Sequence, residues 1–319
     1  MRLAVLGCGS IGRRHLRNLL ALGARALVAF DPLEAACQSV STETGIPAHT
    51  SLAAIWKFKP DAMLITAPSN LHVSLALEAA RRGCDLFIEK PLSSSLDGLG
   101  ELAAEIEKHN LISLVGCNMR FHPGPAAVKS LLDQNKIGAV LSARIQCGSY
   151  LPRWRPQQDY RQSYSASPES GGAILDCIHE IDLALWYLGP ASLLASARLP
   201  ARPLGLETDG LAELLLRHDS GALSSVHLNF VQRDYRRGCQ IIGADGTIYW
   251  DFSERVVKVF GQDGTLSDTL SEPVGWEANQ MYLDEMQHFL HAVQTRQPSV
   301  NPISGGVAAL KIALAARDS

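Results

Sequence analysis

The stretch from Leu3 to Asp31 restricts the fold of this chain more than any other part of the sequence. An apolar run precedes the turn Gly7-Cys8-Gly9-Ser10-Ile11-Gly12, leucines then recur at helical spacing, and a second apolar run ends at Asp31. This order predicts a strand, a tight turn, a helix and a second strand, the arrangement of a dinucleotide-binding βαβ unit. A glycine-rich turn alone would be weak support, but here the strand and helix patterns surround it.

Each part of the turn has a physical role. Gly7 allows a tight turn, Gly9 allows a pyrophosphate to approach the backbone, and Gly12 allows the helix to pack closely on the strand. Free N–H groups at the positive end of the helix bind phosphate. We therefore expect the following residues to bind a dinucleotide: Gly7, Gly9, Ser10, Ile11 and Gly12.

Asp31 favours NAD as the cofactor. It follows Gly12 by 31 − 12 = 19 positions, close to the spacing of a carboxylate that binds the ribose hydroxyls. Its charge would also repel the 2′-phosphate of NADP. Arg13 and Arg14 could bind that phosphate or could face solvent, so NADP stays open as a second cofactor.

Length, charge and cysteine content exclude several classes of protein. The 319 residues exceed what one hydrophobic core usually organises, so two domains are expected. A formal net charge of −3 offers no basic surface for nucleic acid, and no apolar run is long enough to span a membrane. The seven cysteines are scattered without a C-x-x-C pair, so we expect neither a disulfide framework nor a metal site. We expect a cytoplasmic protein, because too few residues precede Cys8 for a signal peptide and the thiols suit a reducing compartment.

The first domain is expected to be a doubly wound parallel sheet of the Rossmann type over residues 1–118. Buried-strand patterns alternate there with helical patterns, at 62–66, 71–82, 85–89, 96–109 and 113–117. Strands that alternate with helices form a parallel sheet with helices on both faces.

Residues 119–319 are expected to form an α+β domain with a large, mostly antiparallel open sheet. Strand patterns separated by turn signals follow one another there, at 140–149, 212–217, 222–230, 238–242 and 247–251. Helices are predicted over 173–188, 279–295 and 304–316. The polar, arginine-bearing stretch 151–170 is predicted to be a loop over the site.

Ligands of a doubly wound sheet bind beyond the carboxyl ends of its strands. Three segments follow predicted strands, 66–70, 89–91 and 118–120, and they should line one crevice with the glycine turn. Lys90 is the most informative of these residues, because its ammonium could hydrogen-bond a substrate oxygen and stabilise charge that develops there. A solvated surface charge is the alternative. Pro91 is a candidate for a cis peptide bond.

A second set of polar residues lies in the predicted helix that follows Gly171 and Gly172. Asp176 and His179 are three positions apart, so on a helix they would share one face. Such a pair is more often a surface ion pair. Beside a cofactor it could act as an acid and base, because imidazole titrates near neutral pH and the carboxylate can orient the ring or the substrate.

Four separated motifs together resemble the glucose-fructose oxidoreductase and inositol dehydrogenase family (Gfo/Idh/MocA). They are Gly7-x-Gly9-x-x-Gly12, Glu89-Lys90-Pro91, Gly171-Gly172-x-x-x-Asp176-x-x-His179 and the turn Gly243-Ala244-Asp245-Gly246-Thr247. The resemblance implies a Rossmann domain followed by a domain whose open sheet commonly forms a homodimer or homotetramer interface. It implies hydride transfer between nicotinamide and a carbinol or carbonyl carbon of a sugar, a polyol or a sugar derivative.

The resemblance also implies the roles of individual residues. Lys90 would polarise the reacting oxygen, Asp176 would position the lysine or the substrate, and His179 would be the general acid or base. The cofactor side would be lined by Lys90 itself and by Thr66, Pro68, Asn70, His72, Glu89 and Asn118.

The loop after Tyr150 is similar to that of family members tied to bacterial surface-polysaccharide sugars. Arg155, and Arg120 in the crevice, could bind a carboxylate or phosphate of an anionic substrate. Trp154 or Tyr160 could stack on a sugar ring. Packing within the loop or an oligomer contact is the alternative.

Two other functions remain open from the sequence. An NAD-dependent glycosidase of the same family would oxidise its substrate transiently and form no net NADH. In a non-catalytic NAD-binding sensor, Lys90, Asp176 and His179 would have no chemical role. The presence of all three residues therefore disfavours the sensor.

Replacement of Asp31 by serine should raise the relative use of NADP, because the carboxylate that repels the 2′-phosphate is removed. The measurement is the ratio of kcat/KM for NADP to kcat/KM for NAD in the variant and in the original protein. An unchanged ratio would mean that Asp31 does not contact the ribose.

Overall fold

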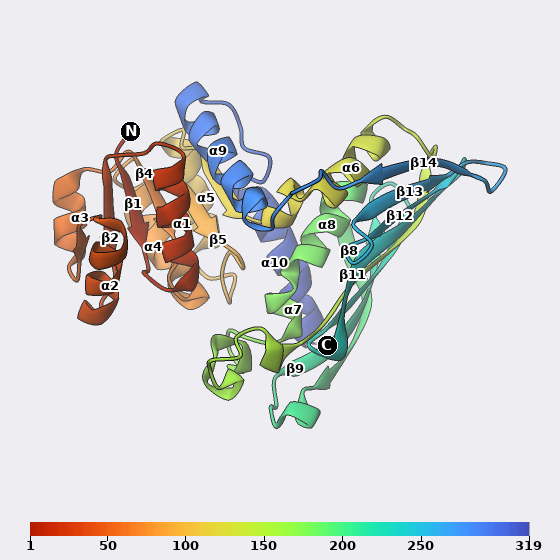
Figure 1. The fold of residues 1–319 in the computed structure, drawn as a ribbon, viewed down its shortest axis with the longest axis horizontal. Helices are drawn as coiled ribbons and strands as arrows, with labels where there is room; N and C mark the ends of the chain where they lie inside the picture. Colours follow the sequence, from red (N-terminus) through yellow and green to blue (C-terminus); the bar gives the residue numbers. More distant parts are fainter. Residues whose placement is uncertain (319) are drawn as a thin grey trace. The chain divides into compact units, whose positions relative to one another are not determined.

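The computed structural model describes residues 1–318, which form two compact units (Figure 1). Unit 1 comprises Met1–Asn118 together with Ala278–Val307, and unit 2 comprises Met119–Glu277 together with the residues from Ala308 onward. Among the described residues, no helix is long and apolar enough to cross a membrane.

Unit 1 contains a six-stranded parallel sheet in the order β3-β2-β1-β4-β5-β6. The doubly wound parallel sheet predicted from the sequence is confirmed, and the order is that of a dinucleotide-binding fold. Strands β1, β2 and β4 are apolar along their length, and β5 is apolar between Asp85 and Glu89, because helices cover both faces. The strands are β1 (Leu3–Leu6), β2 (Leu27–Phe30), β3 (Ala48–His49), β4 (Ala62–Ile65), β5 (Asp85–Glu89) and β6 (Ser113–Gly116).

The helices of unit 1 include one that comes from late in the chain. They are α1 (Ser10–Ala21), α2 (Glu34–Thr44), α3 (Leu52–Phe58), α4 (His72–Ala80), α5 (Leu99–Lys108) and α9 (Asn279–Thr295). Met286 and Phe289 of α9 belong to the same hydrophobic core as Leu3 and Leu16. The division drawn from the sequence assigned α9 to the second domain, because periodicity shows that a helix has an apolar face but not which core that face meets.

Unit 2 is built on an eight-stranded sheet in the order β14-β13-β12-β11-β7-β10-β9-β8. All neighbouring strands are antiparallel except β7 and β10, so the predicted mostly antiparallel sheet is confirmed. The strands are β7 (Val140–Tyr150), β8 (Ala191–Pro200), β9 (Asp209–His218), β10 (Leu223–Asn229), β11 (Val231–Gly243), β12 (Thr247–Asp251), β13 (Val256–Phe260) and β14 (Leu266–Ser271).

Helices pack on one face of this sheet. In β9, Ala212, Leu214 and Leu216 are buried, whereas Glu213 and Leu215 point outward and are exposed, the period of two that a half-covered strand requires. The buried face meets α6 (Pro123–Asp133), α7 (Ala173–Asp176) and α8 (Ile178–Leu188), while the outward face carries no helix among the described residues (Figure 1).

The helix predicted over 173–188 is divided in the structure. It breaks at Cys177, whose φ of −97° and ψ of 30° are not helical, so α7 ends at Asp176 and α8 begins at Ile178. Residues on both sides of the break are buried all round. The apolar pattern therefore continues through the break, and the sequence has no glycine or proline to mark it.

Candidate active site

The glycine turn of unit 1 is shaped by close contacts within the protein. Gly7 has a φ of +109°, and a Cβ there would lie 2.7 Å from the backbone of Thr66. A Cβ on Gly12 would lie 1.8 Å from the carbonyl oxygen of Gly7. By contrast, a Cβ on Gly9 would meet no atom of the described residues within 4 Å. Gly7 and Gly12 are thus required by packing, whereas Gly9 leaves open space beside the backbone.

The first turn of α1 can receive an anion. Gly9 is the N-cap of this helix, and no side chain caps it. Ser10, the first helical residue, is exposed. The N–H groups of the first turn therefore point toward space that a pyrophosphate can enter, where the positive end of the helix also favours negative charge. The residues present fit a dinucleotide.

Asp31 holds the turn to the end of β2. Its Oδ2 accepts a hydrogen bond from the backbone N–H of Cys8 at 2.8 Å, and its Oδ1 accepts one from Leu33 at 2.9 Å. Each carboxylate oxygen keeps a second lone pair for a ribose hydroxyl. Burial, reinforced by the charge of Asp31, raises the pKa of the Cys8 thiol to about 12, so this cysteine stays neutral.

The two arginines after the turn have partners inside unit 1. Arg13 donates to the hydroxyl of Ser39 at 3.2 Å, and the guanidinium of Arg14 lies 4.4 Å from the centre of the Tyr282 ring. Cation–π contacts of this kind hold an arginine in place.

Thr66 and His72 support the loops that follow β4 and β5. The hydroxyl of Thr66 lies 2.8 Å from the carbonyl oxygen of Gly7 and donates to it. The ring nitrogens of His72 lie 2.7 Å from the carbonyl oxygen of Ala67 and 3.0 Å from that of Pro91. Burial lowers the pKa of His72, so the neutral ring donates to one of these carbonyls. His72 is 1% exposed and acts on the shape of the two loops.

The remaining candidates of unit 1 lie at the same edge of the sheet. Pro68 and Asn70 are exposed after β4, and Asn118 is buried after β6. Lys90 follows β5 directly and is half-buried, and the peptide bond between Lys90 and Pro91 is cis. The structure thus places these residues beyond carboxyl ends of strands, where ligands of this fold bind.

In unit 2, a buried carboxylate that sequence analysis missed anchors α7. Asp209 of β9 is 2% exposed, and its Oδ2 accepts a hydrogen bond from the N–H of Ile174 at 2.8 Å. A Cβ on Gly172, whose φ is +99°, would lie 2.3 Å from Oδ1 of Asp209. Arg317 of α10 (Ile303–Asp318) lies 3.6 Å from the same carboxylate. The glycine pair before α7 therefore makes room for this anchor.

Asp176 and His179 lie on either side of the break between α7 and α8. Asp176 is 5% exposed and His179 is 8% exposed. Cys177 between them is no competing nucleophile, because a hydrogen bond with Cys147 and burial raise the pKa of its thiol. The pair is positioned by two short helices rather than by one helix face.

The other acidic residues near His179 are committed to arginines. Arg120 donates from Nε and Nη2 to Asp182, at 2.8 and 2.7 Å, so this fork is engaged within the protein. Arg237 binds Glu180 in the same way, at 2.6 and 3.1 Å. Burial, the largest single effect, lowers the pKa of Arg237, but the charge of Glu180, the neighbouring Cys147 and Tyr235, and the hydrogen bond to Glu180 together raise that pKa above its usual value.

Three predicted substrate residues line one small pocket in the loop 151–170. Trp154, Arg155 and Tyr160 contribute to it, together with Leu151, Gln158, Ser163 and Ser165. The indole N–H of Trp154 donates to Ser149 at 3.0 Å, and the hydroxyl of Tyr160 donates to the Leu204 carbonyl at 3.0 Å. The guanidinium of Arg155 lies over the Tyr164 ring, 5.4 Å from its centre.

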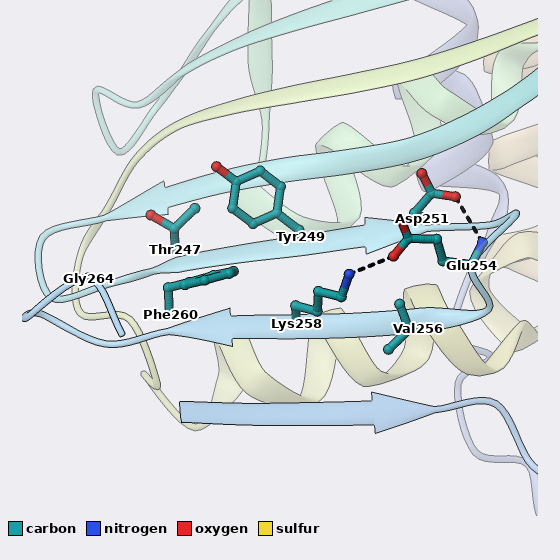
Figure 2. A pocket seen from close by; sticks show the side chains of 8 residues that line it. All are labelled: Thr247, Tyr249, Asp251, Glu254, Val256, Lys258, Phe260 and Gly264. Atoms are coloured by element: carbon teal, nitrogen blue, oxygen red, sulfur yellow. Dashed lines mark hydrogen bonds and ion pairs between the residues drawn. The ribbon is translucent and has the colours of Figure 1, made fainter. Parts of the chain in front are cut away.

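A larger hollow lies on the outward face of β12 and β13 (Figure 2). The side chains of Tyr249 and Phe260 line this hollow, and the ammonium of Lys258 donates a hydrogen bond to the carboxylate of Glu254 at 2.6 Å. None of the candidate site residues lines this hollow. Within the described residues, no group of three or more His, Cys, Asp or Glu side chains is placed to hold a metal ion.

Two family models match most of the chain. Residues 1–117 match an oxidoreductase family with an NAD-binding Rossmann fold (Gfo/Idh/MocA), and residues 126–249 match the C-terminal domain of that family.

Several known proteins are similar over their whole length. The scyllo-inositol 2-dehydrogenase (NAD(+)) of Bacillus subtilis is 27% identical, with 100% of this chain and 94% of that protein covered. The myo-inositol 2-dehydrogenase of Thermotoga maritima is 27% identical, with 100% and 96% covered. A structure of levoglucosan dehydrogenase with NADH and levoglucosan superposes with a TM-score of 0.90 at 19% identity, with 100% and 96% covered. This last likeness concerns the fold.

Gly12→Ala should lower the stability of the protein, whereas Gly9→Ala should lower its affinity for NADH. Gly12→Ala places a methyl group against a backbone carbonyl, so we expect a loss of stability of about 2 kcal/mol or more. Gly9→Ala should leave stability unchanged, because its methyl group meets only open space, but should weaken NADH binding at least tenfold by blocking the pyrophosphate. Thermal unfolding and NADH fluorescence titration measure the two effects, and normal NADH affinity in Gly9→Ala would contradict this placement of the cofactor.

Proposed function

Because this chain belongs to the Gfo/Idh/MocA family of NAD-binding oxidoreductases, we propose that it transfers a hydride between NAD and a carbinol or carbonyl carbon of a polyol, a sugar or a sugar derivative. The observation that carries this proposal is the edge of the unit 1 sheet, where the open glycine turn, Asp31 and Lys90 all follow carboxyl ends of strands. Full-length relatives that are named as inositol dehydrogenases support the substrate class.

Oxidation of an alcohol releases a hydride and a proton, and a residue of this chain accepts the proton. When NAD is bound, its nicotinamide accepts the hydride. Lys90 donates a hydrogen bond to the reacting oxygen and stabilises the negative charge that grows on it. His179 accepts the hydroxyl proton as the general base, and Asp176 orients the lysine or the substrate. In the reverse direction His179 returns the proton to the carbonyl oxygen.

The side chains of the loop 151–170 are proposed to contact the part of the substrate that does not react. Trp154 and Tyr160 present aromatic rings whose polar atoms are already hydrogen-bonded within the protein. Arg155 can form a bidentate pair with a carboxylate or phosphate. We therefore expect an anionic sugar derivative to have a lower KM than its neutral counterpart.

None of the relatives reported above is a glycosidase or a sensor.

Replacement of Lys90 or of His179 by alanine should lower kcat by about 10²-fold to 10⁴-fold, since each removes a group that acts on the reacting oxygen or its proton. NADH affinity should stay within about threefold of the original value. Turnover is followed by NADH absorbance with a panel of inositols, neutral sugars and the matching sugar acids.

Lys108→Ala and His291→Ala are matched controls, because both residues are exposed on helices of unit 1. Both controls should keep full activity. Full activity in Lys90→Ala and His179→Ala as well would refute the proposed mechanism. Aryl glycoside cleavage without net NADH would replace the dehydrogenase by the glycosidase.

The chain is further proposed to be a cytoplasmic homodimer or homotetramer that associates through the outward face of the unit 2 sheet. Leu215 and Leu223 are large apolar side chains exposed on the neighbouring strands β9 and β10, and Tyr249 is exposed on β12 of the same face. Exposed apolar side chains that gather on one face of a sheet support an interaction surface there. All seven cysteines lie among the described residues, and they are buried and form no disulfide with one another, as suits a reducing compartment.

Tyr249→Glu should convert the oligomer to monomers, because it places a charge on the proposed contacting face. The control is Leu96→Glu, which changes an exposed leucine of unit 1. Light scattering coupled to size-exclusion chromatography measures both. A monomeric original protein would overturn the proposed association.

A further inference from the structure

A buried histidine lies directly behind the end of β5. His15 of α1 is 0% exposed, and its Nε2 lies 2.7 Å from Oε1 of Glu89. The other oxygen of the same carboxylate, Oε2, accepts the backbone N–H of Lys90 at 3.0 Å. One carboxylate therefore joins the helix of the glycine turn to the backbone of Lys90.

The surroundings of His15 indicate which ring nitrogen donates. Its Nδ1 is buried and has no hydrogen-bond partner in the described part of the chain. A proton on Nδ1 would leave an unpaired, buried N–H at this atom. We therefore place the proton of His15 on Nε2, from which it donates to Oε1 of Glu89.

Aromatic rings keep the His15 ring in this orientation. Phe87 of β5 meets it edge-on with ring centres 4.9 Å apart, and Tyr282 of α9 does so at 6.2 Å. The guanidinium of Arg14, the neighbour of His15 on α1, lies over the Tyr282 ring, 4.4 Å from its centre. Elements from three distant parts of the sequence thus hold one donor against Glu89.

We propose that His15 is a positioning residue for the hydride-transfer reaction: by donating to Glu89 it holds the carboxylate that fixes the backbone of Lys90, and so fixes the direction of the Lys90 side chain. The inference rests on the proposed function, because it assigns its effect to Lys90. His15 itself touches neither the substrate nor the exchanged proton.

The experiment compares two substitutions at position 15. His15→Phe keeps an aromatic ring beside Phe87 and Tyr282 but removes the donor, and should lower kcat by about 10-fold to 100-fold, the size expected when a catalytic group is misplaced by about 1 Å. His15→Gln keeps an N–H donor of similar reach and should recover most of that loss. NADH affinity should stay near the original value in both variants. The thermal unfolding temperature should fall in His15→Phe, because Oε1 of the buried Glu89 loses its donor, and should fall less in His15→Gln.

A double-mutant cycle tests whether His15 acts through Glu89. Glu89→Ala removes the acceptor, so adding His15→Phe to it should lower kcat by less than about twofold. The matched control is Arg17→Ala, which removes the exposed ion pair with Glu43 from the same helix, and which should change neither kcat nor NADH affinity.

Three results would overturn the inference. They are an unchanged kcat in His15→Phe, multiplicative effects in the cycle, and a loss of NADH affinity as large as the loss of kcat. If His15→Phe does not fold, the test rests on His15→Gln. An inactive but stable His15→Gln would also overturn the inference, because the retained donor would then have no effect on kcat. These outcomes are distinct from failure of the proposed function, which Lys90→Ala tests separately.

Discussion

The close approach of α1 to the end of β1 is the constraint on which the functional part of unit 1 depends. A methyl group on Gly12 would lie 1.8 Å from the carbonyl oxygen of Gly7, so no other residue allows the helix to start where it does. Thr66 from β4 donates to the same carbonyl, and Asp31 holds the N–H of Cys8. The turn is thus fixed from both neighbouring strands, while the space beside Gly9 stays open for a ligand.

In unit 2, several charged side chains are buried around the two short helices α7 and α8. Arg120 pairs with Asp182, Arg237 pairs with Glu180, and Asp209 caps the start of α7. A buried charge without a partner would cost several kcal/mol. Asp209 of β9 and Arg237 of β11 attach α7 and α8 to the sheet, and Arg120 attaches α8 to the turn before α6. Asp176 and His179 are positioned by those two helices.

The sequence predicted well wherever one local pattern decided the outcome. The glycine turn, five of the six parallel strands and the change to an antiparallel sheet after Asn118 follow from glycine spacing and from apolar runs. The two-residue strand β3 was not predicted, because it is too short to form an apolar run. The break at Cys177 escaped prediction because fully buried residues on both sides continue the apolar pattern. The placement of α9 in unit 1 escaped it because an amphipathic helix does not specify its partner.

In the candidate site, too, residues within local motifs were predicted and residues with distant partners were not. Lys90, Asp176, His179 and the glycine turn could be named from local motifs, since each needs a particular residue type at a particular spacing. His15 and Asp209 could not, because their partners lie 74 and 35 residues away in the chain. The sequence by itself determined which chemical groups are present and on which elements they stand. Only the tertiary structure decided which buried donor meets which carboxylate, because hydrogen bonds between distant segments depend on how helices pack on the sheet and leave no periodic trace in the sequence.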